Sequence, residues 1–141
     1  MICKMLVLLC MASAGCDGSQ PGVVVAREAD HYVVSVLNCS DPKWAGLPVR
    51  EIDVGKTPPG VRVAAQCELH RSPEWRGEDG DRLMRWRYGS QPKGFILEHC
   101  AALEPEMTYE IYVSQQPQPV RGRFKVTSNG EVTMFEGPCH K

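Results

Sequence analysis

The chain has 141 residues, with 16 Lys and Arg against 17 Asp and Glu and a formal net charge of −1. This length suits one domain, and the balanced charge argues against a nucleic-acid partner, which would favour a strongly basic domain. Seven cysteines are present, none spaced as Cys-x-x-Cys, so the pattern favours disulfides over a zinc site built on thiolates.

The first 16 residues have the order of a secretory signal. Lys4 precedes an apolar run over residues 5–11, and small residues at 12–15 lead to Cys16. The run is shorter than the about 20 residues that a membrane-spanning helix needs. Small residues ending in Ala-Gly-Cys resemble the signal of bacterial lipoproteins, in which signal peptidase II cuts before the cysteine. The resemblance implies acyl chains on Cys16, which would anchor the protein to an envelope membrane facing the periplasm.

An ordinary secretion signal stays open as the alternative. The leucine usual in lipoprotein signals is replaced by Ser13, and residues 12–14 form an A-x-A site. A cut after Ala14 would give a soluble periplasmic or secreted protein. Cysteine parity favours lipidation, because an unlipidated Cys16 would be a fifth, free thiol beside four cysteines that can pair. Asp17 resembles the inner-membrane retention signal of enteric bacteria, but other bacterial groups use different rules, so inner and outer membrane both stay open.

These signals divide the chain into three parts. We expect a signal peptide over 1–15, a lipidated N-terminus and tether over 16–22, and a single β-sandwich domain over 23–141. Without Lys4 the chain carries 15 Lys and Arg against 17 Asp and Glu, a formal net charge of −2. No long apolar segment follows the signal, so the lipid is the expected membrane contact.

Short β-branched or alternating runs, separated by turn residues, predict strands along the whole domain. In chain order these runs are 23–27, 31–37, 48–54, 61–69, 83–88, 94–99, 109–113, 123–126 and 131–135. Many short strands and no helical period predict an all-β fold, a sandwich or barrel.

Three of these runs carry finer predictions. In the run 61–69, alternation places one set of side chains on a single face: Val61, Val63, Ala65, Cys67 and Leu69. In the run 83–88, Met84, Trp86 and Tyr88 should lie on one face of the strand, and Arg85 and Arg87 on the other. Between the runs 123–126 and 131–135, Asn129-Gly130 predicts a β-hairpin.

One segment resembles the tyrosine corner of immunoglobulin-like and fibronectin type III domains. Leu103, Pro105 and Tyr109 are followed by Ile111 and Val113 at alternating positions. The resemblance implies a β-sandwich in which the Tyr109 hydroxyl reaches back to an upstream backbone group, and it implies no function.

The cysteines depart from the immunoglobulin pattern. Immunoglobulin domains have a disulfide cysteine two residues after the tyrosine, where this chain has Ile111. Three connectivities are therefore open for the remaining four cysteines, and we favour Cys67–Cys100 with Cys39–Cys139.

No motif for catalysis or for a cofactor is present. The four histidines, His31, His70, His99 and His140, form no HExxH or His-x-His pair. Gly-x-Ser-x-Gly and Ser-x-x-Lys are also missing. Residues 78–81 resemble a fragment of a calcium loop, but the downstream ligands are lacking, so we expect a solvated turn. We therefore expect no enzyme activity, no metal and no cofactor. The alternative, an enzyme or metal protein, requires two histidines, or a histidine and a carboxylate, in one cleft.

Loop aromatics and cations are the candidates for partner binding. Trp44, Trp75 and Arg76 lie in charged loops, where tryptophan either caps the core or anchors a partner. Five cations would form a basic strip if the strands that carry them were neighbours: Arg85, Arg87, Arg121, Arg123 and Lys125. The favoured interpretation is an ordinary outward face on which acidic side chains are mixed with these cations.

The sequence thus predicts an envelope lipoprotein with a non-enzymatic binding or structural role, holding a protein or glycan partner. The alternatives are an inhibitor or immunity-type lipoprotein against an envelope-active enzyme, and a small histidine-based periplasmic enzyme. Residues 86–94, followed by Leu103, Pro105 and Tyr109, resemble a pattern in small exported bacterial proteins, a resemblance that implies no activity.

Overall fold

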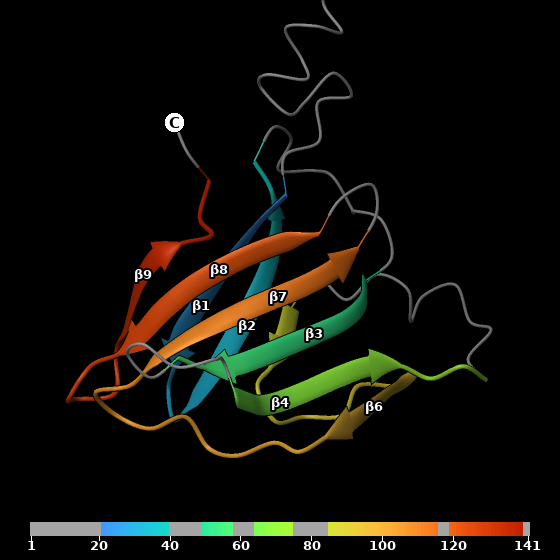
Figure 1. Cartoon of the computed structure of the whole chain (residues 1–141), viewed down its shortest axis with the longest axis horizontal. Helices are drawn as coiled ribbons and strands as arrows, with labels where there is room; N and C mark the ends of the chain where they lie inside the picture. Colours follow the sequence, from blue (N-terminus) through green and yellow to red (C-terminus); the bar gives the residue numbers. More distant parts are fainter. Residues whose placement is uncertain (1–20, 40–48, 58–63, 75–84, 116–118, 140–141) are drawn as a thin grey trace, which may run out of the picture.

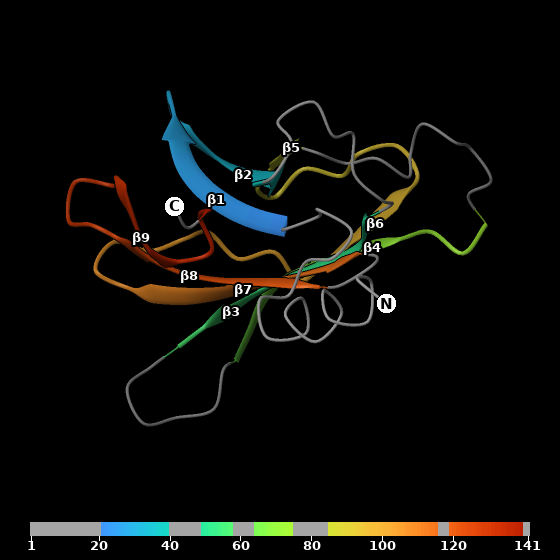
Figure 2. The same cartoon turned by 90° about the horizontal axis from the view of Figure 1, so that it is seen from above.

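The protein is a sandwich of two antiparallel sheets (Figures 1 and 2). The computed structural model describes residues 21–39, 49–57, 64–74, 85–115 and 119–139. Within these ranges the strands are β1 (Pro21–Glu28), β2 (His31–Asn38), β3 (Val49–Lys56), β4 (Ala64–Arg71), β5 (Arg85–Arg87), β6 (Phe95–Glu98), β7 (Thr108–Gln115), β8 (Val120–Val126) and β9 (Val132–Glu136). One sheet has the order β1-β2-β5 and the other β6-β4-β3-β7-β8-β9. The predicted all-β sandwich is confirmed. No helix among the described residues has the length and hydropathy to cross a membrane.

The core lies between the two sheets and follows the predicted alternation. Inward side chains of both sheets are almost fully buried, among them Val23, Val34, Ile52, Val54, Trp86, Tyr109, Ile111, Val113, Phe124 and Val126. The outward neighbours of Trp86, Arg85 and Arg87, are exposed. The Trp86 indole Nε1 donates a hydrogen bond to the Ser90 carbonyl at 2.9 Å, so the largest buried side chain has its polar atom satisfied.

The order of neighbouring strands matches that of immunoglobulin-type sandwiches. The strands β1-β2-β5 occupy the places of strands A, B and E, and β3-β7-β8 occupy those of C, F and G. Tyr109 lies near the start of β7, as a tyrosine corner does on strand F. The six-stranded sheet continues beyond this common part through β4 and β6 on one side and β9 on the other.

One face assignment on β4 is wrong. Cys67 and Leu69 are buried as predicted, but Ala65 is exposed. Cys67 is paired with Val54, and Ala65 with the next residue Gly55, so β4 carries one additional residue at this point. Such a bulge shifts the alternation and turns Ala65 outward. Val61, Val63 and Met84 lie outside the described residues.

The Asn129-Gly130 hairpin is confirmed between β8 and β9. The Thr127 amide donates to the Glu131 carbonyl at 2.8 Å, so three residues form the loop. Gly130 has a φ of +86°, the left-handed conformation that glycine adopts at the end of such a loop. The Tyr32 hydroxyl donates to the Gly130 carbonyl at 2.8 Å and ties this hairpin to β2.

The sheets are joined along one edge. The Val23 amide donates to the Gly137 carbonyl at 2.8 Å, and a Cβ on Gly137 would lie 2.7 Å from the Val23 carbonyl oxygen. Glycine is therefore required for this close approach. Beside it the disulfide Cys39–Cys139 links residues 100 positions apart in the sequence. The second disulfide is Cys67–Cys100, so both pairs are those that the sequence favoured.

The tyrosine corner forms at the start of β7. The Tyr109 side chain is buried, and its hydroxyl accepts a hydrogen bond from the Glu104 amide at 2.7 Å. Its ring stacks on Phe124 with the ring centroids 5.5 Å apart. The contact fixes the chain where it enters the central part of the six-stranded sheet.

Tyr109→Phe should lower the free energy of unfolding by about 1 kcal/mol, the typical net value of one hydrogen bond. Urea denaturation measures this change, and Tyr112→Phe, on the outward face of the same strand, should change it by less than about 0.5 kcal/mol. Equal losses in the two variants would show that the Tyr109 hydroxyl has no special role.

Candidate functional site

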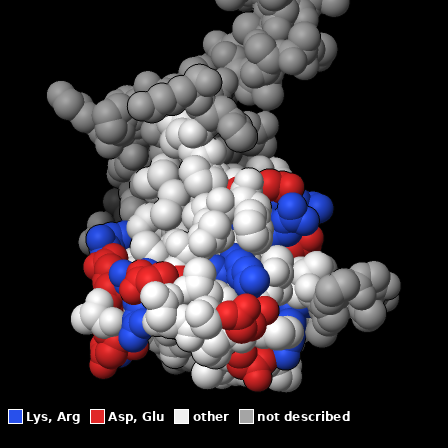
Figure 3. All heavy atoms as spheres, turned by 90° about the vertical axis from the view of Figure 1, so that its left-hand side faces the viewer, with Lys and Arg blue, Asp and Glu red and all other residues white. Residues whose placement is uncertain are grey.

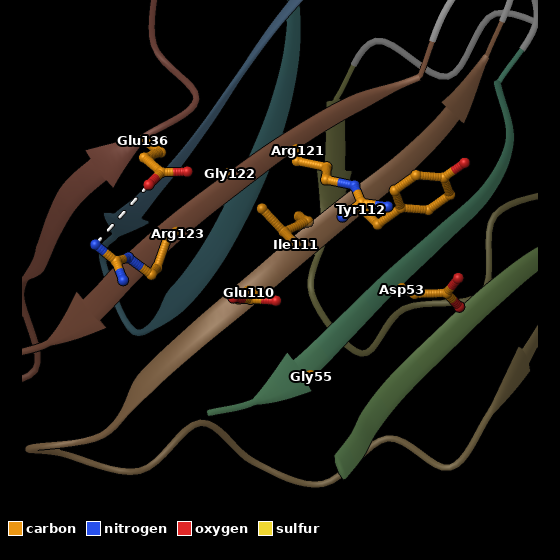
Figure 4. A pocket seen from close by; sticks show the side chains of 9 residues that line it. All are labelled: Asp53, Gly55, Glu110, Ile111, Tyr112, Arg121, Gly122, Arg123 and Glu136. Atoms are coloured by element: carbon orange, nitrogen blue, oxygen red, sulfur yellow. Dashed lines mark ion pairs between the residues drawn. The ribbon is translucent and has the colours of Figure 1, made fainter. Parts of the chain in front are cut away.

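The outward face of the six-stranded sheet contains a hollow of about 350 Å³ (Figure 4). Its lining comes from four neighbouring strands: Asp53 and Gly55 on β3, Glu110, Ile111 and Tyr112 on β7, Arg121, Gly122 and Arg123 on β8, and Glu136 on β9. Antiparallel pairing builds it, because Asp53 lies opposite Tyr112, and Tyr112 opposite Arg121. In the next row Gly55 lies opposite Glu110, and the glycine leaves space where other residues would project a side chain.

Two cations on β8 lie over aromatic rings beside this hollow. The Arg121 guanidinium is 5.4 Å from the centre of the Tyr112 ring, and that of Arg123 is 5.5 Å from the Phe135 ring. These distances are typical of cation–π contacts. Arg123 also approaches Glu136 at 3.9 Å. Phe135 is 50% exposed, so this part of the face offers an apolar surface edged with guanidinium groups.

The other side of the same face is acidic. A cross-strand row runs from Asp53 on β3 through Glu68 on β4 to Glu98 on β6. Burial raises the pKa of Asp53 to about 7, and the neighbouring carboxylates of Glu51 and Glu68 add to this effect. The Asp53 Oδ1 atom is buried without a hydrogen-bond partner. Asp53 thus lies where the acidic row meets the hollow.

The described histidines lie in two places: His70 and His99 on the acidic side of this face, and His31 on the other sheet. His70 Nε2 is 3.3 Å from Glu98 Oε1 on the acidic side of the face. His31 lies on β2, and its Nδ1 is 3.2 Å from Asp30 Oδ1.

The His31–Asp30 pair lines a second hollow of about 370 Å³ at the edge of the three-stranded sheet. The hydrogen bond from His31 lowers the pKa of the Asp30 carboxyl. Because Asp30 is 91% exposed, this pair lacks the water-excluded surroundings in which acid–base groups are usually tuned. His140 lies outside the described residues.

The five cations of the possible basic strip belong to separate sheets. Arg85 and Arg87 lie on β5, and Arg121, Arg123 and Lys125 on β8. Carboxylates accompany them: Arg85 pairs with Glu28, and Lys125 with Glu106 at 3.5 Å. On the side of the molecule in Figure 3, basic and acidic side chains are likewise interspersed. The surface is the mixed outward face that the sequence favoured.

Several predicted sites lie outside the described residues: Cys16, Trp44, Trp75, Arg76 and the segment 78–81. They stay predictions. The hollow and the acidic row had no sequence signal of their own, since they unite residues from strands that are distant in the chain. Only the strand register brings Asp53, Tyr112 and Arg121 together.

The raised pKa of Asp53 predicts a pH dependence of stability. The unfolded chain should release this proton near pH 3.8, whereas the folded protein keeps it until about pH 7. The contribution to stability is therefore complete below the unfolded pKa and is lost as the pH rises through about 7. Glu68 and His70 on β4 and Glu51 on β3 are the other charged groups that act on this carboxyl.

Asp53→Asn should flatten the fall in unfolding free energy between pH 5 and pH 8, and urea denaturation at a series of pH values measures it. Asp30→Asn is the control, because the pKa of Asp30 is lowered and its effect belongs to more acidic solutions. If the unfolding free energy of Asp53→Asn fell with pH as steeply as that of the wild type, the raised pKa of Asp53 would be contradicted.

Comparison of the chain with models of protein families, with curated proteins and with solved structures finds no match.

Proposed function

We propose that this protein is a lipid-anchored, non-enzymatic binding module of the bacterial envelope that holds a protein partner. The partner would dock on the hollowed outward face of the six-stranded sheet. One observation carries the proposal: Arg121 and Arg123 lie over Tyr112 and the exposed Phe135 beside a hollow that also offers carboxylates. Arginine and aromatic residues are enriched at the centres of protein interfaces.

The chemistry of this face favours a protein over a glycan. A sugar ring would stack on an open aromatic face, but the Arg121 guanidinium already lies over the Tyr112 ring at 5.4 Å. The two guanidinium groups suit carboxylates of a partner, to which arginine donates paired hydrogen bonds. Glu110, which also lines the hollow, suits its cations. The partner that fits is a protein surface with both charges.

The two disulfides support an extracytoplasmic location, because disulfides persist in oxidising compartments. They also occupy Cys39, Cys67, Cys100 and Cys139, so none of these four is available to Cys16. Lipidation of Cys16 removes the thiol that would otherwise be left over. Each buried methylene of an acyl chain contributes about 0.8 kcal/mol, and more than one chain gives stable attachment.

Cys16→Ser should move the protein from the membrane fraction to the soluble fraction, because the variant has no thiol to carry the lipid. Immunoblots of separated fractions measure this change, and mass spectrometry of the wild type should find acyl chains on residue 16. A wild-type N-terminus at Gly15 without modification would show secretion by the ordinary signal peptidase.

A photoreactive amino acid in place of Phe135 should form crosslinks to one protein species in intact cells. Adding Arg121→Glu and Arg123→Glu should abolish this crosslink, since the guanidinium groups that meet the partner are reversed in charge. The matched control is Arg85→Glu with Arg87→Glu, two outward arginines at the same spacing on the opposite sheet, which should leave the crosslink unchanged.

Two results would overturn the proposed partner class. Crosslinking that survives the charge reversals on β8 would place the interface elsewhere. Retention of the protein on purified cell-wall glycan, lost in Arg121→Glu and without any protein crosslink, would make the partner a glycan.

A further inference from the structure

A second cluster lies at the β4–β6 end of the acidic row, outside the hollow. Glu68 on β4, Glu98 on β6 and His99 directly after β6 each offer one ligand atom, and these atoms lie within 4.8 Å of one another. His70 adds a second imidazole, with its Nε2 3.3 Å from Glu98 Oε1. Two carboxylates and two imidazoles thus meet on one short stretch of the β4–β6 ladder.

The strand register holds like charges together here. Glu68 lies directly opposite Glu98, and on its other side it lies opposite Asp53. Like charges at directly opposed positions destabilise a sheet. A cation bound between Glu68 and Glu98 would turn this repulsion into attraction.

A covalent link fixes the spacing of the cluster. Glu68 follows Cys67 and His99 precedes Cys100, and these two cysteines form a disulfide. The Ala101 amide also donates to the Gln66 carbonyl at 3.0 Å, so backbone pairing continues past the disulfide. His99 has a φ of +46°, which interrupts the strand alternation that would otherwise send its imidazole to the face opposite Glu98. The fold therefore holds the three ligand residues near one another before any ion binds.

We propose that Glu68, Glu98 and His99 form a binding site for a divalent transition-metal ion, with Zn²⁺ as the best match. Zinc takes imidazole nitrogen and carboxylate oxygen at about 2.1 Å, which places ligand atoms on a tetrahedral ion about 3.4 Å apart. Glu98 and His99 are both exposed, so their side chains have room to turn toward a shared ion. Calcium needs six to eight oxygen ligands, and an imidazole favours zinc, copper or nickel over calcium or magnesium.

This site adjoins the proposed partner surface but lies outside its hollow. None of Glu68, Glu98 and His99 lines the hollow, and the ion would bind at the β4–β6 edge of the sheet. The exposure of Glu98 and His99 leaves coordination positions open to water, which makes the bound ion exchangeable.

The test is calorimetric titration of the tag-free mature protein with zinc chloride. We expect one zinc ion per chain in the wild type, and a loss of affinity of at least about tenfold in both Glu98→Gln and His99→Ala. His31→Ala is the matched control, because His31 forms a similar surface pair with Asp30 on the other sheet, and its affinity should match the wild type. Calcium chloride should produce no comparable heat.

A second variant separates metal binding from folding. Glu68→Gln should raise the Tm of the metal-free protein because it relieves the repulsion with Glu98, and it should abolish the rise in Tm that zinc causes in the wild type. The proposal is overturned if the wild type binds no zinc, if Glu98→Gln and His99→Ala bind it as the wild type does, or if calcium binds equally well.

Discussion

The connection from β6 to β7 is the constraint on which the rest of the structure depends. It must carry the chain from an edge strand past β4 and β3 to the strand beyond them. The disulfide at Cys100 fixes its beginning, and the Gln66 amide holds its middle by donating to two successive carbonyls, at 3.0 and 3.1 Å. The Tyr88 hydroxyl donates to the first of these carbonyls, that of Ala101, at 2.6 Å. At its end the Glu104 amide meets Tyr109. This crossing delivers the chain to β7, whose pairing with β3 builds part of the outward face.

The bulge on β4 links this connection to the shape of the surface. The additional residue is Gln66, which lies between the residues paired with Val54 and Gly55. Freed from the regular ladder, its carbonyl and its amide side chain both bind the connection. The same bulge brings Ala65 opposite Gly55, so two small residues share the outward face next to Glu110. A local irregularity thus stabilises the crossing and also helps to leave the face hollow.

The sequence predicted elements whose cause is local, and missed features that depend on distant pairing. Alternation was enough for β7 and β8, because each strand buries one face against the same core. The hairpin at Asn129-Gly130 and the tyrosine corner at Tyr109 are also local. In contrast, Glu98, Glu68, Asp53, Tyr112 and Arg121 belong to one cross-strand row, although five separate segments contribute them. The reversal at Ala65 and the left-handed backbone of His99 come from tertiary contacts and leave no pattern in the sequence.

That row also orders the charge of the outward face. Carboxylates occupy its β6, β4 and β3 positions, an aromatic ring lies on β7, and a guanidinium lies on β8. Because the charges are separated along the row, a partner that carries both signs gains full attraction in one orientation and meets repulsion in the reversed one. Asp53, at the boundary, holds its proton up to about pH 7, which reduces the negative charge at the β3 position of the row. Under the proposed binding role, this separation of charge would select one orientation of the partner more than it would raise the total attraction.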